Sequence, residues 1–166
     1  MNATARFALP LLHSGQAQKE LFHNEALTLA DALLQPCVEA AAVDVPPAAP
    51  EPGQCWIIGE SPVGAWAGEA GSLAVWSSGG WRFVPPREGM AVWVTADALP
   101  ARYAAGSWHT GRLTAASLEI DGEQVVGPRE PAIDDPDGGG VVDAEARTAI
   151  EAILEALRTH GLIDPA

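Results

Sequence analysis

Apolar residues recur at helical spacing in a stretch near the start of the chain, residues 14–42. Leucines dominate its apolar positions, and their intervals are compatible with one or two amphipathic helices. Ser14 is the expected N-cap of a first helix, and Asn24, followed by Glu25, would cap a second. Pro36 ends or kinks this stretch, because proline lacks the N–H that a helix interior uses. One bent helix and two separate helices both remain open.

The clearest helical pattern lies at the other end of the chain. Asp143 is the expected N-cap, Arg158 stands near the end and Gly161 stops the helix, in agreement with the helix dipole and with glycine capping. An apolar stripe runs along this helix, and most of its members have the spacing of a coiled-coil seam. Because about two heptads are unstable alone, the stripe must pack on the subunit's own sheet or on other copies of the chain. The stripe consists of Ala146, Ile150, Ile153, Leu154 and Leu157.

Between these helical stretches, short runs of β-branched and aromatic residues bounded by glycine, proline and serine predict strands. A proline-rich connector, residues 43–53, separates the helical start from the first run. The sequence therefore predicts a small sheet after the connector. The four runs are 55–58, 73–76, 81–84 and 90–94.

Glycine-containing turns predict how these strands pair. Residues 77–80 predict an antiparallel hairpin between Trp76 and Trp81, since glycine supplies the positive φ that a tight hairpin requires. A weaker hairpin of the same kind is expected over 101–109, around Ala105-Gly106. Asp121-Gly122 is a strong signal for one more hairpin, between 118–120 and 124–126.

These elements predict an α+β fold for the 166 residues, which suffice for one compact domain or two very small units. The expected parts are an N-terminal helix or helix pair, a small antiparallel β unit of short hairpins, and a C-terminal amphipathic helix. We divide the chain into an N-terminal helical attachment region, a Trp- and Gly-rich β domain, a hairpin with an acidic Gly-rich loop, and an oligomerisation helix. Their boundaries are 1–45, 54–112, 113–140 and 141–166.

The chain is strongly acidic, with 9 Lys and Arg against 22 Asp and Glu and a net charge of −13. From Glu119 onward there are 12 acidic residues and three arginines. Such a charge disfavours nucleic acid and anionic membrane surfaces as partners. No segment approaches the roughly 18 to 20 apolar residues of a membrane span, so we expect no membrane insertion and synthesis in the cytoplasm. Cys37 and Cys55 form no disulfide framework and are expected as free thiols.

Familiar catalytic motifs are missing from the sequence. It has no G-x-S-x-G, H-E-x-x-H, G-x-x-x-x-G-K-[ST] or G-x-G-x-x-G, so we assign no catalytic residue and expect neither a cofactor nor a metal. The four histidines are interpreted as capping or surface residues. Asp135, Asp137 and Glu145 resemble calcium ligands in spacing, but the order of an EF-hand loop is not kept. We therefore interpret residues 134–140 as a flexible, solvated acidic loop.

Six tryptophans are the strongest chemical signal in the chain. Indole rings can stack on sugar rings and donate a hydrogen bond at the edge, and they can equally fill the core of a small sheet. We expect most of them in the core. Trp66 and Trp108 lie in Gly-rich surroundings and are the expected exposed pair, and hence the candidate glycan-binding residues.

Several short motifs stand out within residues 5–110. They are L-P-L-L at 9–12, G-Q-A-Q-K-E at 15–20, H-N-E-A-L at 23–27, G-A-W-A-G at 64–68, G-W-R-F at 80–83 and P-R-E-G at 86–89. Together they resemble a domain of unknown function, the DUF2793 type, found in proteins of alphaproteobacterial prophages and gene transfer agents. The C-terminal segment is similar to the ends of the same phage-type proteins. The resemblance implies a component of a tail-like particle, a tail fibre or a baseplate-associated protein, and carries over no catalytic residue.

The resemblance also implies partners. Tail appendages are commonly homotrimers, and the closing apolar stripe would then be covered by sister copies. Polar residues of the N-terminal helix would dock on tail or baseplate proteins, while the Trp-bearing β unit would face a host surface polysaccharide. A capping role and a solvated helix face explain the polar residues equally well. The docking candidates are Gln16, Gln18, Lys19, His23 and Asn24.

Two alternatives remain open from the sequence. The first is a small glycosidase that trims polysaccharide, with Glu60 and Glu69, or Glu88 and Asp97, on either side of a Trp-lined groove. The second is a structural spacer of the particle with no ligand.

Overall fold

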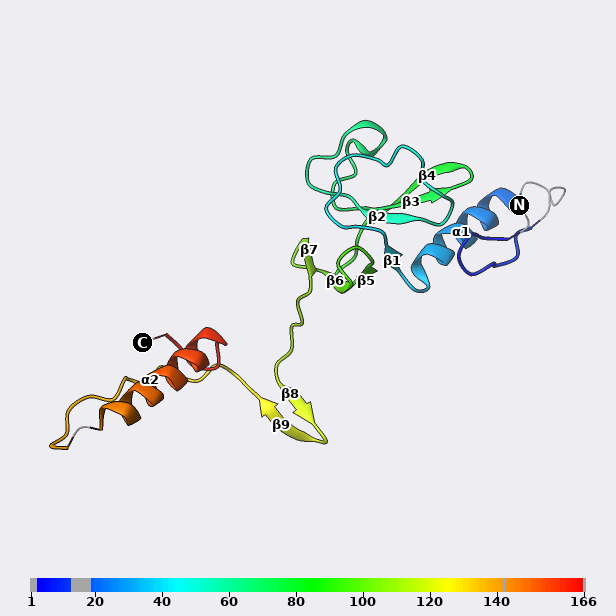
Figure 1. Cartoon of the computed structure of the whole chain (residues 1–166). Coiled ribbons are helices and arrows are strands. Elements are labelled where there is room, and N and C mark those ends of the chain that lie inside the picture. Colours follow the sequence, from blue (N-terminus) through cyan, green and yellow to red (C-terminus); the bar gives the residue numbers. More distant parts are fainter. Residues whose placement is uncertain (1–2, 13–18, 142, 166) are drawn as a thin grey trace. The chain divides into compact units, whose positions relative to one another are not determined.

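The computed structural model describes residues 3–12, 19–141 and 143–165 and divides the chain into two compact units, Met1–Arg112 and Leu113–Ala166 (Figure 1). We call them unit 1 and unit 2. The described residues form two α-helices and three small sheets. Every pairing of two strands is antiparallel except that of β1 (Cys37–Val38) with β5 (Ala91–Val94). The predicted α+β class is confirmed.

Unit 1 begins with one helix, α1 (Lys19–Leu33). Asn24 lies inside it, so the prediction that Asn24 caps a second helix is wrong. Its amide instead accepts from the Leu12 N–H at 2.9 Å and donates to the Leu12 carbonyl at 3.0 Å. The Asn24 side chain thus satisfies both backbone polar groups of Leu12, as a neighbouring strand would. These bonds attach the segment before α1 to the side of the helix. Ser14, the other expected cap, lies outside the described residues.

A second attachment of the N-terminal segment depends on Asp31, a buried carboxylate of α1. It accepts hydrogen bonds from the Thr4 hydroxyl and the Phe7 N–H, both at 2.7 Å, and from the Arg6 N–H at 2.8 Å. Arg6 also donates to two carbonyls at the C-terminal end of the helix, those of Ala32 and Gln35. A buried carboxylate is stable when its oxygens receive several donors in this way.

The predicted helical stretch ends earlier than expected, because Cys37–Val38 forms a strand, β1. It pairs in parallel with β5 (Ala91–Val94), which continues antiparallel into β6 (Leu99–Ala104) and β7 (Ser107–Thr110). The expected weaker hairpin is the β6–β7 pair, and its turn residues Ala105 and Gly106 have φ of 50° and 82°. Positive φ at both turn residues is the geometry of a tight two-residue hairpin.

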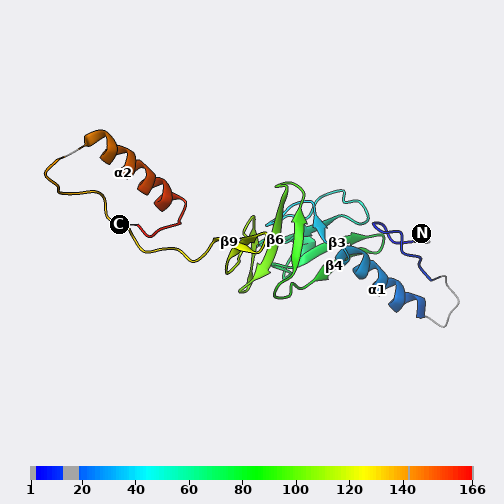
Figure 2. The ribbon, with the colours of Figure 1, turned by 90° about the horizontal axis from the view of Figure 1, so that it is seen from below.

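The second sheet of unit 1 contains β2 (Cys55–Ile57), β3 (Leu73–Ser77) and β4 (Gly80–Val84) in sequential order. Trp76 lies opposite Trp81 across the predicted hairpin. A short 3-10 helix, η1 (Gly64–Trp66), stands between β2 and β3. Figure 2 shows both sheets beside α1, and the Arg82–Glu25 ion pair joins β4 to that helix.

Both faces of the β2–β3–β4 sheet are covered. One face packs on the four-stranded sheet and α1, through Ile57, Leu73 and Val75 against Val92 and Val94. The other face carries a cluster of tryptophans, in which Trp56 and Trp66 are buried and Trp76 and Trp81 close the edge. Ring centroids in this cluster are 4.8 to 6.2 Å apart, mostly in edge-on arrangements that aromatic pairs favour.

Unit 2 contains the hairpin of β8 (Leu118–Ile120) and β9 (Glu123–Val126) followed by α2 (Ala144–Thr159). The Asp121-Gly122 turn has positive φ at both residues, as the sequence predicts. Asp143 caps α2 by accepting the Ala146 N–H at 2.9 Å, and Gly161 after the helix has φ of 71°. The predicted boundaries of this helix are confirmed.

The acidic loop before α2 is not the free linker that we expected. Arg158 pairs with Asp135 at 3.1 Å and donates to the Ile133 carbonyl, and Arg147 donates to the carbonyls of Pro136 and Gly138. In Figures 1 and 2 the chain between β9 and α2 accordingly runs alongside the helix and then reverses direction where α2 begins. Two arginines of one helix face therefore hold this segment.

Candidate functional site

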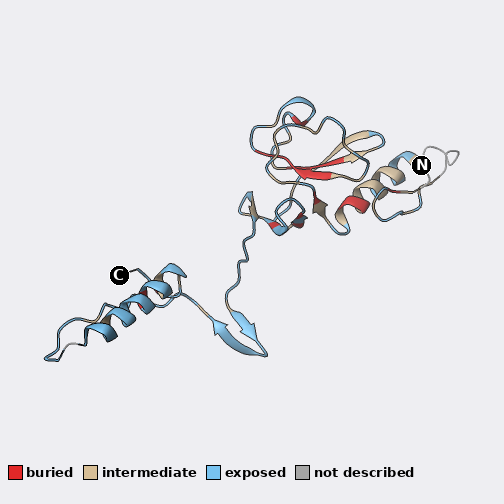
Figure 3. Ribbon diagram, viewed as in Figure 1, coloured by how far each residue is buried: buried red, intermediate tan, exposed pale blue. Residues whose placement is uncertain are grey.

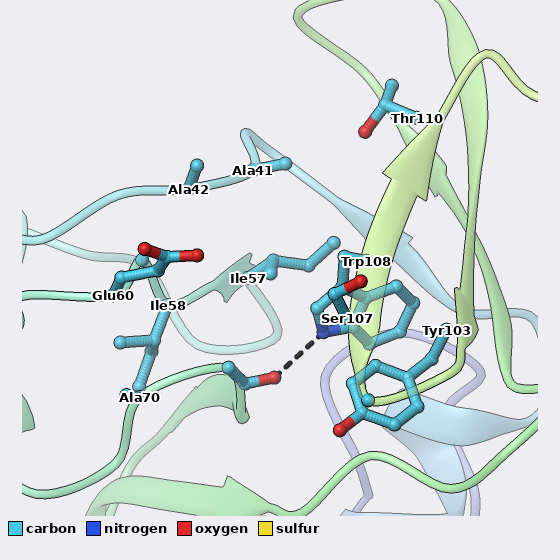
Figure 4. A pocket seen from close by; sticks show the side chains of 13 residues that line it. Ala41, Ala42, Ile57, Ile58, Glu60, Ala70, Tyr103, Ser107, Trp108 and Thr110 are labelled. Atoms are coloured by element: carbon cyan, nitrogen blue, oxygen red, sulfur yellow. Dashed lines mark hydrogen bonds between the residues drawn. The ribbon is translucent and has the colours of Figure 1, made fainter.

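The candidate site is a cavity of about 340 Å³ in unit 1. Figure 4 shows Glu60, Ile58 and Ala42 on one side of it and Tyr103, Trp108 and Thr110 on the other. The residues come from the chain after β1, from the end of β2 and the chain after it, from the turn before β3, and from the β6–β7 hairpin. The lining is Ala41, Ala42, Ile57, Ile58, Gly59, Glu60, Ala70, Gly71, Tyr103, Gly106, Ser107, Trp108 and Thr110.

Tyr103 and Trp108 form an aromatic wall, and the strand pairing fixes its geometry. They are direct cross-strand partners in β6 and β7, with ring centroids 5.4 Å apart and an interplanar angle of 67°. The Trp108 indole N–H donates to the Gly71 carbonyl at 2.8 Å, which is the dashed line in Figure 4. The indole is thus held to the turn before β3, and its N–H is already used within the protein.

Glu60 lies across the cavity from the aromatic wall, on a segment that packs against Asp44. A Cβ at Gly59 would lie 2.3 Å from Asp44 Oδ1, so a larger residue at this position would displace the Asp44 carboxylate. The same Asp44 oxygen accepts the Ser61 N–H at 2.9 Å. Glu60 itself is exposed and forms no hydrogen bond or ion pair within the described part of the chain. The segment is therefore fixed on both sides of a carboxylate that is free to meet a ligand.

This arrangement is suited to binding a small ligand. It combines an aromatic wall, small residues such as Ala70 and Gly71, the Thr110 hydroxyl and one carboxylate. Ligand sites commonly have apolar walls with a few polar groups and volumes of about 300 to 1,000 Å³. A cavity of about 340 Å³ is at the lower end of that range and fits one ring better than a chain of rings.

The two tryptophans expected at the surface have different positions. Trp108 lines the cavity, whereas Trp66 is 0 % exposed inside the tryptophan cluster. The prediction of an exposed Trp66 is wrong because η1 turns the indole into the core, where its N–H has no partner among the described residues. The glycines around Trp66 shape that turn and do not expose the ring.

Trp93 is the exposed tryptophan that sequence reasoning missed, at 47 %. It alternates in β5 with Val92 and Val94, which are both buried. Successive side chains of a strand point to opposite faces of the sheet. Because the two valines mark the inward face of β5, Trp93 between them lies on the outward face.

The docking candidates of the N-terminal helix are placed in part. Gln16 and Gln18 lie outside the described residues, Lys19 is the first residue of α1, and His23 is exposed on it. Asn24 is held by Leu12, so the structure gives this side chain a role inside the subunit.

The carboxylate pairs considered for a glycosidase are not assembled at the cavity. Glu60 lines it, whereas Glu69, Glu88 and Asp97 are not among the described lining residues. Glu88 instead accepts the Ala105 N–H at 3.1 Å, which supports the β6–β7 turn. The two-carboxylate mechanism needs both groups about 5 to 10 Å apart around one bond.

The apolar stripe of α2 is buried along one edge and exposed along the rest. Leu154 is 6 % exposed on the covered side, and Leu157 is half-buried. Ile150 and Ile153 are 44 % and 59 % exposed, and Ala146 is exposed as well. The unit thus covers one edge of the stripe and leaves most of the seam open.

Within residues 3–12, 19–141 and 143–165, no group of three or more metal-ligating side chains is found. Asp135, one of the calcium candidates, is engaged by Arg158. No helix in these ranges is long and apolar enough to cross a membrane.

Fold and cavity together define a small α+β protein with an aromatic-walled cavity. Residues 23–109 match the family model described as "Protein of unknown function (DUF2793)", and the chain belongs to this family. The match extends from α1 to β7 and includes every residue that lines the cavity except Thr110. No curated protein matches the chain.

Proposed function

We propose that this protein is a structural component of a phage-like tail, a tail fibre or a baseplate-associated protein. In this proposal unit 2 joins three copies, α1 docks on a neighbouring tail or baseplate protein, and the cavity of unit 1 binds a sugar of the host surface. The tail assignment is supported by the resemblance of the L-P-L-L, G-Q-A-Q-K-E and H-N-E-A-L motifs to prophage and gene transfer agent proteins. The location that follows is the tail of the particle.

The observation that carries the proposal is the missing core of unit 2. Among its described residues only two large apolar side chains are buried, Leu154 and Ile163. Figure 3 shows the contrast between this unit, almost entirely exposed, and the buried sheets of unit 1. The exposed apolar residues of unit 2 are Leu113, Leu118, Ile120, Val125, Val126, Ile133, Val141, Ile150, Ile153 and Leu162.

The hairpin of unit 2 supports the same conclusion. Every residue of β8 and β9 is exposed, although Leu118, Ile120, Val125 and Val126 are apolar. An isolated two-stranded hairpin is at best marginally stable in water and needs a third strand or a packed face. Copies of the chain would supply that face.

The open seam of α2 favours other copies of the same helix as the covering partner. Ala146, Ile150, Ile153 and Leu157 have coiled-coil spacing, and a helix of 16 residues is too short for stability without tertiary or quaternary burial. Burial shared among copies stabilises such a helix by mass action. The number three comes from the class of tail appendage that the motifs resemble.

A mass measurement in solution tests this proposal. We expect the full chain to have three times its 17.2 kDa subunit mass in sedimentation equilibrium. Ile153→Glu should dissociate the assembly, because it places a charge in the seam where it would be buried without a partner. Thr148→Glu is the matched control, since it adds the same charge to another exposed position of α2 and should leave the mass unchanged. A monomer with a folded unit 2, or an Ile153→Glu trimer, would overturn the proposal.

A further inference from the structure

We infer that the cavity of unit 1 selects a sugar that carries a protonated amine, with the ring against Tyr103 and Trp108 and the ammonium group at Glu60. This inference rests on the proposed sugar-binding role and adds the chemical class of the ligand.

Charge is the first argument. Glu60 is the one charged side chain among the residues that line the cavity, and it has no cation beside it within the described part of the chain. Unit 1 and unit 2 are both acidic, and the chain as a whole carries −13. A ligand carboxylate or phosphate would meet repulsion here, whereas an ammonium group would meet attraction from the carboxylate and from the surrounding field.

Hydrogen-bond capacity points the same way. An ionised carboxylate is an acceptor only, so Glu60 requires a donor from the ligand. The Trp108 N–H, which could otherwise have bound a ligand acceptor, is held by the Gly71 carbonyl. The remaining side-chain hydroxyls at the cavity are those of Tyr103, Ser107 and Thr110, and Ser107 already contacts His109 at 3.2 Å. These hydroxyls can donate or accept, so the carboxylate of Glu60 sets the preference for a donor on the ligand, and an amine offers up to three.

The aromatic wall accounts for the ring. The C–H face of a sugar packs on indole and phenol rings. Because β6 and β7 fix the Tyr103–Trp108 pair, the wall is formed before the ligand arrives. Small residues at Ala41, Ala42 and Ala70 leave the space in front of it open.

The experiment compares three small ligands on the full chain by calorimetry at about pH 6, where an ordinary Glu is ionised and an amine is protonated. Glucosamine, methyl glucoside and glucuronate share the ring and differ in charge. Because an exposed ion pair contributes up to about 1 kcal/mol, we expect glucosamine to bind up to about fivefold more tightly than methyl glucoside, and glucuronate more weakly than both. Glu60→Gln should abolish the preference for the amine. Glu51→Gln is the control, since it removes an equal charge from an exposed position away from the cavity.

The outcomes separate the inference from the proposed function. Equal binding of glucosamine and methyl glucoside, unchanged in Glu60→Gln, would overturn the selection of an amine and leave the sugar site standing. If none of the three ligands binds, both the selection and the sugar-binding role fail, while the trimer is judged by its own mass measurement. Ethanolamine, an amine without a ring, should bind more weakly than glucosamine, and equal binding would overturn the role of the aromatic wall.

Discussion

Asp31 and Cys55 are buried polar side chains that connect α1, the N-terminal segment and β2. Asp31 receives three donors from residues 4–7, and Arg6 from the same segment reaches the Cys55 sulfur at 3.8 Å. Burial raises the pKa of the Cys55 thiol from 9.0 to about 11, and the Arg6 guanidinium counteracts this only in part. Cys55 is therefore a neutral core residue at ordinary pH and a poor nucleophile.

The raised pKa of Cys55 predicts a loss of stability at high pH. In the unfolded chain the thiol ionises near pH 9, whereas the folded protein keeps its proton until about pH 11. The folded state thus holds more protons in this window, and the free energy of unfolding should fall by up to about 3 kcal/mol as pH rises through it. Denaturant unfolding of the wild type and of Cys55→Ala at each pH measures the difference. Parallel pH profiles for the two proteins would contradict this prediction.

The element that bears the cavity wall contains an unusual backbone conformation. Ala105, the first residue of the β6–β7 turn, has φ of 50°, a region that disfavours residues with a Cβ and accepts asparagine more readily. The strand pairing and the Glu88 hydrogen bond to the Ala105 N–H hold the turn in this conformation.

Ala105→Asn should stabilise unit 1 by about 1 kcal/mol, because Asn-Gly is the preferred pair for such a turn. Thermal unfolding measures the change as a rise in Tm of a few degrees. Ala91→Asn, at an exposed position of the neighbouring β5, is the control and should give no gain. An equal gain at both positions would mean that the turn conformation is not the cause.

Elements with local signals could be predicted from the sequence, and those that depend on distant partners could not. The caps and stripe of α2 and the three Gly-containing hairpin turns were all readable within a few residues of each element. β1 contains two residues and exists through its pairing with β5, more than fifty positions later. Nothing local in Cys37–Val38 distinguishes it from the end of a helical stretch.

At the scale of the whole molecule, charge opposes the association that the apolar surface favours. Unit 2 contains 12 acidic residues and three arginines, and three copies would bring these charges together. Two of the arginines are engaged within the unit by the segment before α2. The third, Arg129, pairs with Asp164. In the proposed trimer, screening by salt and apolar burial would therefore have to offset the repulsion among copies.

Trimer formation should consequently strengthen with salt. Raising sodium chloride from about 0.1 M to 1 M shortens the Debye length from about 10 Å to 3 Å and weakens repulsion between exposed carboxylates. Sedimentation equilibrium should give tighter association at the higher concentration. Glu155→Gln, which removes one exposed charge from α2, should reproduce part of the effect at low salt. Weaker association at high salt would indicate an interface held by ion pairs.

The candidate site shows where sequence reasoning reaches its limit. Trp108 was singled out by its Gly-rich turn, and its register opposite Tyr103 follows once the β6–β7 hairpin is accepted. From the sequence, Glu60 was considered only as one of two catalytic carboxylates. That it faces Trp108 across a cavity could not be predicted. That juxtaposition depends on Gly59, Asp44 and the turn before β3, which come from separate parts of the chain.

The helix α2, the hairpin turns, the acidity of the C-terminal third and the α+β class can all be predicted from the amino-acid sequence, since each depends on neighbouring residues or on composition. Contacts in the folded chain bury Trp66 and expose Trp93, add β1 to the four-stranded sheet, and bring Glu60 and the aromatic pair to one cavity. The physical reason is that burial and pairing are properties of contacts between distant segments. A local sequence pattern restricts which distant segments can come into contact, but it does not specify which of these contacts form.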